Sequence, residues 1–114
     1  MSRIYKILPR ALWQAAQAAG HLDGAAIDLT DGYIHLSTAE QAQDTARLHF
    51  RGQADLVVLT VDTVPLGAAL KWETSRGGQL FPHLYGPLDP VHVVAVTEAP
   101  LDAEGVPQLG PLAP

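Results

Sequence analysis

The chain has 114 residues, a formal charge of −5 and no cysteine, which allows one domain and excludes disulfides and thiolate metal sites. Apolar residues make up 47% of the chain and charged residues 17%, values typical of a globular rather than a disordered protein. The seven basic residues are scattered, which argues against nucleic-acid binding, and the lack of a secretion signal or a membrane-length apolar run predicts a soluble, cytoplasmic protein.

Two strand–helix units separated by a loop are predicted in the N-terminal half. Alternating β-rich residues indicate the strands, and alanines at helical spacing indicate the helices. The predicted elements are a strand at residues 3–8, a helix at 9–19, a loop at 21–30, a strand at 33–36 and a helix at 38–50. Gly20 is a stop signal for the first helix. The second helix begins at a capping box, either Ser37 with Glu40 or Thr38 with Gln41.

The C-terminal half is predicted to add strands only, which makes the chain a single α+β domain spanning residues 1–114. Near-continuous apolar runs predict central strands at residues 55–61 and 91–97. A shorter strand is expected at residues 70–74, followed by a turn and a rigid loop bounded by prolines. The tail at residues 98–114 contains four of the nine prolines. We expect it to be partly ordered, with a loose turn at 102–105, an edge strand near 106–109 and a frayed end.

The segment at residues 70–88 carries the densest set of chemically useful side chains. They are Trp72, Glu73, Arg76, Phe81, His83 and Tyr85. Glycines and prolines punctuate the segment, and functional groups are often held on such loops by a rigid scaffold. A second cluster lies at residues 31–41. We expect the two segments to face each other and to form a polar cleft whose partner is a small-molecule ligand.

The sequence leaves two interpretations open for each candidate side chain. Glu73 is either a solvated carboxylate paired with Arg76 or Lys71, or it lines a cleft beside an aromatic wall. In the cleft its pKa would rise and it could act as an acid, a base or an electrostatic clamp. His35 is either a core histidine bonded to a backbone carbonyl or, with Ser37 on the same strand face, a donor to a ligand hydroxyl or phosphate.

The proline-bounded loop carries two further candidates. His83 and Tyr85 are two residues apart and either contact a ligand or pin the loop. Gly77 and Gly78 form either an anion-binding nest of amides or an ordinary hairpin turn.

Metal and nucleophile chemistry have weaker signals. A two-histidine-one-carboxylate set of metal ligands could be formed by His35, His83 and Glu73, although their spacing does not require a metal site. The chain has no Gly-x-Ser-x-Gly elbow and no cysteine, so acyl-enzyme chemistry has no support.

The pattern of several motifs resembles a known family. The residues that carry the resemblance are Ile4-Tyr5-Lys6-Ile7, Trp13, Gly20, the run Asp31-Gly32-Tyr33-Ile34-His35-Leu36-Ser37, Gln41, Lys71-Trp72-Glu73 and the run Phe81-Pro82-His83-Leu84-Tyr85-Gly86-Pro87-Leu88. Up to about Val96 the chain is similar to the bacterial domain-of-unknown-function family nine-five-two. That family is in turn similar in fold to the ADP-ribosyltransferase group, which implies a small, bent or split, mostly antiparallel sheet with two helices in the N-terminal half.

The resemblance implies NAD as a cofactor or ligand, held between three strand positions. Lys6 matches the first-strand position, His35 or Ser37 the middle one, and Glu73 the later carboxylate. Lysine departs from the usual histidine or arginine at the first position, and the middle position departs from the usual tyrosine. Glu73 would then hold the nicotinamide ribose 2′-hydroxyl and stabilise the oxocarbenium-like charge as nicotinamide leaves.

The remaining implied roles concern the other parts of NAD. They place His35 or Lys6 on the adenosine side, Arg76 or the Gly77-Gly78 amides at the pyrophosphate, and Phe81 or Tyr85 against the nicotinamide ring. The leading hypothesis is therefore a protein that binds NAD or a related nucleotide or sugar phosphate and transfers or hydrolyses ADP-ribose. Two alternatives stay open: a non-catalytic module that binds a metabolite or a partner protein through the same cleft, and a metal-dependent hydrolase.

Overall fold

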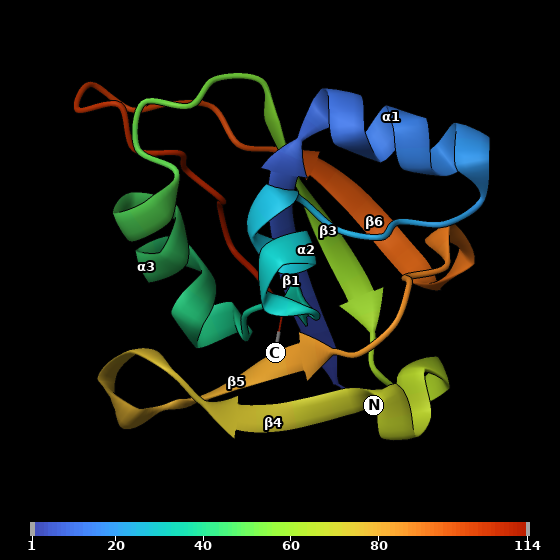
Figure 1. Cartoon of the computed structure of the whole chain (residues 1–114). Coiled ribbons are helices and arrows are strands. Elements are labelled where there is room, and N and C mark those ends of the chain that lie inside the picture. Colours follow the sequence, from blue (N-terminus) through green and yellow to red (C-terminus); the bar gives the residue numbers. More distant parts are fainter. Residues whose placement is uncertain (1, 114) are drawn as a thin grey trace.

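Two three-stranded antiparallel sheets form the framework of the protein, whose computed structural model describes residues 2–113 (Figure 1). The first sheet has the order β1-β3-β6 and the second has the order β2-β5-β4. The strands are β1 (Arg3–Pro9), β2 (Ile34–His35), β3 (Leu56–Asp62), β4 (Leu70–Thr74), β5 (Leu80–Leu84) and β6 (Val93–Glu98). The helices are α1 (Arg10–Ala19), α2 (Ala26–Asp31) and α3 (Ala39–His49), with 3₁₀ turns η1 (Val64–Ala69), η2 (Arg76–Gly78) and η3 (Pro90–His92).

The sequence predicted much of this α+β arrangement. Strand β1 and helix α1 lie within a residue or so of their predicted bounds, and β3 is the central, fully covered strand that its apolar run indicated. Helix α3 begins after Thr38, whose hydroxyl accepts from the Gln41 N–H while the Gln41 side chain accepts from the Thr38 N–H. This reciprocal bonding is one of the two capping boxes predicted from the sequence.

Both faces of β1 and β3 are covered, and each face has its own apolar cluster. Helix α1 and the second sheet pack on the face that presents Ile4 and Leu8. Helix α3 and the C-terminal tail pack on the opposite face, which presents Tyr5 and Ile7. Because side chains alternate along a strand, β1 supplies residues to both clusters.

Two segments predicted as loops contain regular structure instead. Residues 26–31 form helix α2, which Gly32 ends in a left-handed conformation. Residues 80–84 form β5, the middle strand of the second sheet, despite Pro82. Pro82 is tolerated because its nitrogen faces short β2 where that ladder ends: the Pro82 carbonyl accepts from the Leu36 N–H at 3.1 Å and no N–H is needed in return.

Strand β6 corrects the prediction of a second central strand. It pairs with β3 along one side only and forms an edge of the first sheet (Figure 1). Most of its residues are exposed, and Val91 lies outside the strand in η3. A short apolar run satisfies an edge strand as well as a central one, so the run did not decide the position.

The C-terminal tail packs on α3 and returns toward β1. The predicted turn at residues 102–105 is present, with the Gly105 N–H donating to the Asp102 carbonyl at 3.0 Å. The predicted edge strand near residues 106–109 is replaced by a single bridge between Leu101 and Pro107. Leu109 is buried in the α3 cluster, while Pro114, at the expected frayed end, lies outside the described residues. None of the helices in residues 2–113 has the length and apolarity needed to cross a membrane.

Candidate functional site

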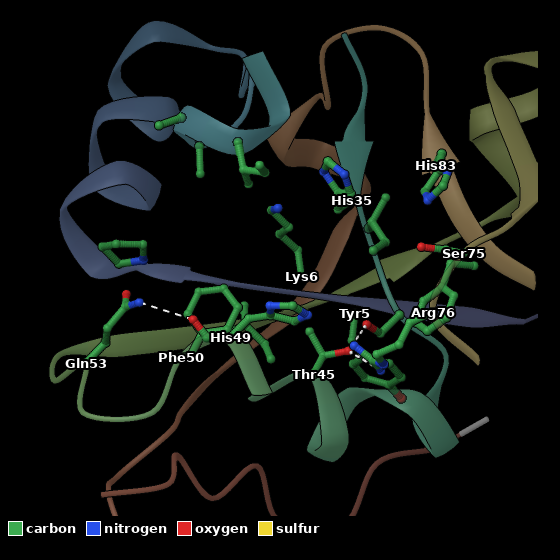
Figure 2. A pocket seen from close by; sticks show the side chains of 18 of the residues that line it. Tyr5, Lys6, His35, Thr45, His49, Phe50, Gln53, Ser75, Arg76 and His83 are labelled. Carbon is green, nitrogen blue, oxygen red and sulfur yellow. Dashed lines mark hydrogen bonds between the residues drawn. The ribbon is translucent and has the colours of Figure 1, made fainter. Parts of the chain in front are cut away.

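A cavity of about 730 Å³ lies along the edge of β1 that faces away from β3. We call it the β1-edge cavity. Its lining residues are Tyr5, Lys6, Ile7, Pro9, Leu12, Ala25, Ala26, Ile27, His35, Leu36, Ser37, Thr45, His49, Phe50, Gln53, Ser75, Arg76, Phe81 and His83. Figure 2 shows His35 and His83 at one end and Phe50 and Gln53 at the other. The volume lies within the roughly 300–1,000 Å³ range of small-molecule sites.

The expectation that the two polar clusters face each other is confirmed by the second sheet. His35 on β2 lies directly opposite His83 on β5, and β5 in turn pairs with β4, which carries Glu73. The two imidazole rings lie 5.5 Å apart between centroids and meet edge to face. Two segments nearly fifty residues apart therefore build one end of the cavity.

Lys6 is a buried cation within the lining of the cavity. Its ammonium lies 2.8 Å from Oδ2 of Asp28, and both side chains are almost completely withdrawn from solvent. Burial lowers the pKa of Lys6, and the neighbouring Asp28 carboxylate partly opposes that shift. Burial alone would raise the pKa of Asp28, but the His35 hydrogen bond and the Lys6 charge outweigh it and bring the pKa well below its usual value.

Asp28 contacts two further cavity-lining residues besides Lys6. Its Oδ2 also accepts from the Ala25 N–H at 2.7 Å, while Oδ1 accepts from the His35 N–H at 3.0 Å and contacts His35 Nδ1 at 2.6 Å. The other ring nitrogen of His35 lies 2.9 Å from Asp31 Oδ2. Both nitrogens of His35 are therefore bound to carboxylates, and neither is free for a ligand while these contacts persist.

His83 is held in a different way. Its Nδ1 lies 2.8 Å from Oε1 of Glu73, and the Tyr85 hydroxyl donates to the same oxygen at 2.8 Å. The hydrogen bonds from His83 and Tyr85 lower the pKa of Glu73, and the bond to Glu73 raises the pKa of Tyr85. Within residues 2–113 no protein group bonds Nε2 of His83, so this buried ring has one nitrogen uncommitted at the cavity wall.

Tyr33 joins the two histidine systems. Its ring centroid lies 4.6 Å from that of His35, 4.2 Å from that of His83 and 5.2 Å from that of Tyr85. Burial, followed by the charges of Asp31 and Glu73, raises the pKa of Tyr33. These aromatic contacts add to the hydrogen bonds that orient the two imidazole rings.

The tip of the β4–β5 hairpin closes another side of the cavity. Arg76 donates to the Thr45 hydroxyl at 3.2 Å, and its guanidinium lies 4.9 Å from the centroid of the Phe81 ring. The Thr45 hydroxyl also lies 3.1 Å from the Ser37 hydroxyl. Gln41 donates to a β5 carbonyl, that of Leu80, at 2.8 Å. These bonds tie the hairpin to α3.

The structure brings six of the ten predicted site residues to the cavity lining. They are Lys6, His35, Ser37, Arg76, Phe81 and His83. Glu73 and Tyr85 lie behind His83 rather than on the lining. Gly77 and Gly78 also lie off the lining, and Gly78 donates its N–H to Ser75 within the hairpin turn at 3.1 Å.

Glu73 departs from both interpretations of the sequence. It is partly exposed, pairs with His83 and Tyr85 rather than with Arg76 or Lys71, and its pKa is lowered rather than raised. Any effect of this carboxylate on a cavity ligand would be exerted through His83. Among the described residues no group of three histidine, aspartate or glutamate side chains is placed to hold a metal ion, which leaves the metal-site hypothesis without geometric support.

Asp28 is the main site residue that sequence reasoning missed. Residues 21–30 were interpreted as a loop, so a carboxylate between Ile27 and Leu29 carried no special meaning. The available signal was a short helical segment ending at Gly32, with an acid in its first turn where it can bond a backbone N–H. Burial of that acid against Lys6 depends on tertiary structure and has no signal in the local sequence.

Comparison with known proteins places the chain in a family. The family described as "Protein of unknown function (DUF952)" matches residues 7–96. The chain belongs to this family. This agrees with the family resemblance of the motifs around Lys6, His35, Glu73 and His83, all of which lie in or next to the cavity.

Solved structures of a similar protein share the fold. The crystal structure of protein CC0527 from Caulobacter crescentus is 60% identical, with 96% of each chain covered and a TM-score of 0.93. The solution NMR structure of CC0527 is also 60% identical, covers 96% of this chain and 95% of that one, and has a TM-score of 0.85. No curated protein matches the chain.

Proposed function

We propose that this protein binds a small organic anion in the β1-edge cavity. The observation that carries the proposal is the charge of the lining: Lys6 and Arg76 face the cavity, whereas no aspartate or glutamate among the described residues does so. The chain as a whole has a formal charge of −5, whereas the lining carries an excess positive charge from Arg76, because Asp28 balances the charge of Lys6. Such a local reversal favours anions over cations as ligands.

Both cations retain unused hydrogen-bond donors. Lys6 has three N–H donors and contacts one carboxylate oxygen, and Arg76 has five and makes one hydrogen bond to Thr45 within residues 2–113. His83 adds an uncommitted ring nitrogen, and Ser37 adds a hydroxyl. A phosphate or carboxylate that enters the cavity can therefore receive charge-assisted hydrogen bonds without displacing existing ones.

NAD, ADP-ribose and sugar phosphates belong to the ligand class that this lining suits. Transfer or hydrolysis of ADP-ribose is a second candidate function, favoured by the pairing of Glu73 with a cavity-lining histidine. The geometry supports binding better than transfer, because Glu73 lies off the lining and would act only by orienting His83 or accepting charge from it. A non-catalytic metabolite-binding module would require no movement of Glu73 toward the ligand.

Calorimetric titration of ADP-ribose and NAD tests the binding proposal. Arg76→Gln should weaken binding about 10- to 100-fold, because a hydrogen bond to a charged group contributes roughly 1.5–3 kcal/mol. Arg47→Gln is the matched control, since Arg47 is exposed on α3 and off the lining. Equal affinity of wild type and Arg76→Gln, or no binding of any phosphate or carboxylate tested, would contradict the proposal.

Release of nicotinamide from NAD separates binding from transfer. If the protein turns NAD over, Glu73→Gln should abolish release while leaving NAD affinity within about threefold, because Glu73 lies off the lining. His83→Gln should abolish release and also weaken NAD binding, because it removes a donor at the cavity wall. Binding without any nicotinamide release in the wild type would leave the binding module as the function and exclude NAD cleavage by this chain alone.

A further inference from the structure

The hydrogen-bond directions of β1 show which backbone groups face the cavity. The Arg10 N–H donates to the Asp55 carbonyl at 3.0 Å, which makes the even-numbered residues of β1 the ones bonded to β3. In an antiparallel ladder, bonded and non-bonded pairs alternate, so the odd-numbered residues point their N–H and C=O groups away from β3. Tyr5 follows this rule: its N–H and C=O exchange hydrogen bonds with Ser37 at 2.8 and 2.9 Å.

Ile7 is the next odd-numbered residue, and its outward backbone groups have no protein partner in residues 2–113. Ile7 is buried and lines the β1-edge cavity. A buried backbone donor and acceptor without partners is uncommon, because each one loses its bond to bulk water. The cavity floor therefore offers one N–H and one C=O, spaced as in an edge strand.

The open edge is only one residue long. Ser37 already occupies the edge at Tyr5, and Pro9, the following odd-numbered residue, has no N–H to offer. An added peptide strand could not extend in either direction. The open edge suits a ligand with a single amide and a single carbonyl group.

Part of the cavity wall is apolar. Leu12 on α1 and Ile27 on α2 are among the large apolar residues exposed on the molecule, and both line the cavity together with Pro9 and Phe50. Exposed side chains that line a single cavity can cover the apolar part of a ligand. The lining thus combines cations, one free backbone pair and an apolar wall.

We propose that the ligand is an N-acyl amino acid with an apolar side chain, bound as one residue added to the edge of β1 at Ile7. The ligand N–H donates to the Ile7 carbonyl, and its carboxylate accepts from the Ile7 N–H and faces the cations of the lining. The side chain lies against Leu12 and Ile27. This assignment rests on the proposed function and narrows its ligand class.

Four small molecules isolate the three parts of the assignment. N-acetyl-L-leucine has all three, the ester 2-acetoxy-4-methylpentanoate lacks the N–H, N-acetyl-L-leucinamide lacks the charge, and N-acetylglycine lacks the apolar group. Calorimetry should show affinity falling about tenfold for the ester and for the amide, and about a hundredfold for the glycine compound. Equal affinity of the ester and N-acetyl-L-leucine would overturn the backbone pairing.

The protein supplies matched variants on one helix. Ile27→Ser should weaken N-acetyl-L-leucine about tenfold and leave N-acetylglycine unchanged. Leu29→Ser is the control, because Leu29 is as exposed on α2 but does not line the cavity. Equal effects of the two substitutions would overturn the apolar contact.

Nuclear magnetic resonance reports on Ile7 directly. Saturation with N-acetyl-L-leucine should move the Ile7 amide proton downfield, and leave the amide of Leu8, which is bonded to β3, nearly unchanged. An unmoved Ile7 amide at saturation refutes the assignment. If ADP-ribose binds and N-acetyl-L-leucine does not, this inference fails and the proposed function stands. If neither binds, both fail.

Discussion

Removal of the Asp28 charge is the most demanding test of the buried contacts among Asp28, Lys6 and His35. Asp28 accepts four hydrogen bonds, from Lys6, from the Ala25 N–H and from two groups of His35, and its side chain is fully buried. In Asp28→Asn the shape is nearly retained, but one oxygen becomes an NH₂ group. That group must face an N–H donor, and the Lys6 ammonium is left without its counter-charge.

The size of the effect follows from burial. Removing one partner of a buried ion pair costs about 3–5 kcal/mol, because the remaining charge stays desolvated. The free energy of unfolding of a small domain is about 5–15 kcal/mol in total, so Asp28→Asn should remove a large part of it. For a chain of this length, that corresponds to a fall in Tm of about 12–20 °C, at roughly 4 °C per kcal/mol.

Urea unfolding measured by tryptophan fluorescence reads this change, because Trp13 is buried in the α1 cluster and reports on core exposure. The midpoint should fall while the slope stays constant, as expected for lost stability without a change in the exposed surface. Asp31→Asn is the matched control. Asp31 also contacts His35, but its side chain is 36% exposed, so the loss should be at most about 1 kcal/mol.

A double variant distinguishes charge from packing. Lys6→Met added to Asp28→Asn removes the stranded ammonium, so the pair of changes should recover about 1–3 kcal/mol relative to Asp28→Asn alone. The reasoning is refuted if Asp28→Asn lowers the free energy of unfolding by less than about 1 kcal/mol. It is also refuted if the double variant is less stable than Asp28→Asn alone.

Three further predictions use the same unfolding assays. Since the folded pKa of Asp28 lies below its unfolded value of about 3.9, the ionised carboxylate stabilises the protein above that pH, and stability should fall as the pH drops below about 4. Asp28→Asn should flatten this acid-side loss, and an unchanged profile would contradict the linkage. Gly24→Ala should lower the urea midpoint more than Gly20→Ala. Both glycines have positive φ, but only at Gly24 would a Cβ lie 2.5 Å from the Asp28 Cβ, so equal midpoints would contradict the contact. Gln41→Ala should cost about 1–3 kcal/mol through the lost cap and the unpaired Leu80 carbonyl, whereas a loss below 0.5 kcal/mol would show that the hairpin needs neither.

Local signals in the sequence were sufficient for the elements whose structure depends on local chemistry. Thr38 and Gln41 are spaced for a capping box and form one. Gly20 ends α1 in the left-handed conformation that its position suggested. Strand β6 shows the limit, because a short run of valines packs equally well at the centre or the edge of a sheet. Its neighbours decide its place, and they are distant in sequence.

The sequence indicated most of the residues of the candidate site, but only part of how they lie relative to one another. The alternation of His35 and Ser37 predicted a shared face, and both residues line the cavity. The role of Glu73 was harder to derive, because strand β5 was taken for a loop. In the observed pairing Glu73 lies diagonal to His83 across the β4–β5 ladder, which places the carboxylate behind the imidazole. This contact can be predicted only when the pairing register between the two strands is known.

The edge of β1 explains why the cavity exists at all. An edge strand exposes unpaired backbone groups, which proteins usually cover or pair. Here one bridge to Ser37 covers Tyr5, and Pro9 has no N–H. Residues of α2 and α3 line the cavity together with Ile7. The apolar pattern of residues 3–8 fixed the strand, but the alternation of its hydrogen bonds fixed which backbone groups face the cavity. In the proposed site, the backbone of β1 would therefore supply the first contacts, and the charged side chains would set the sign of the ligand.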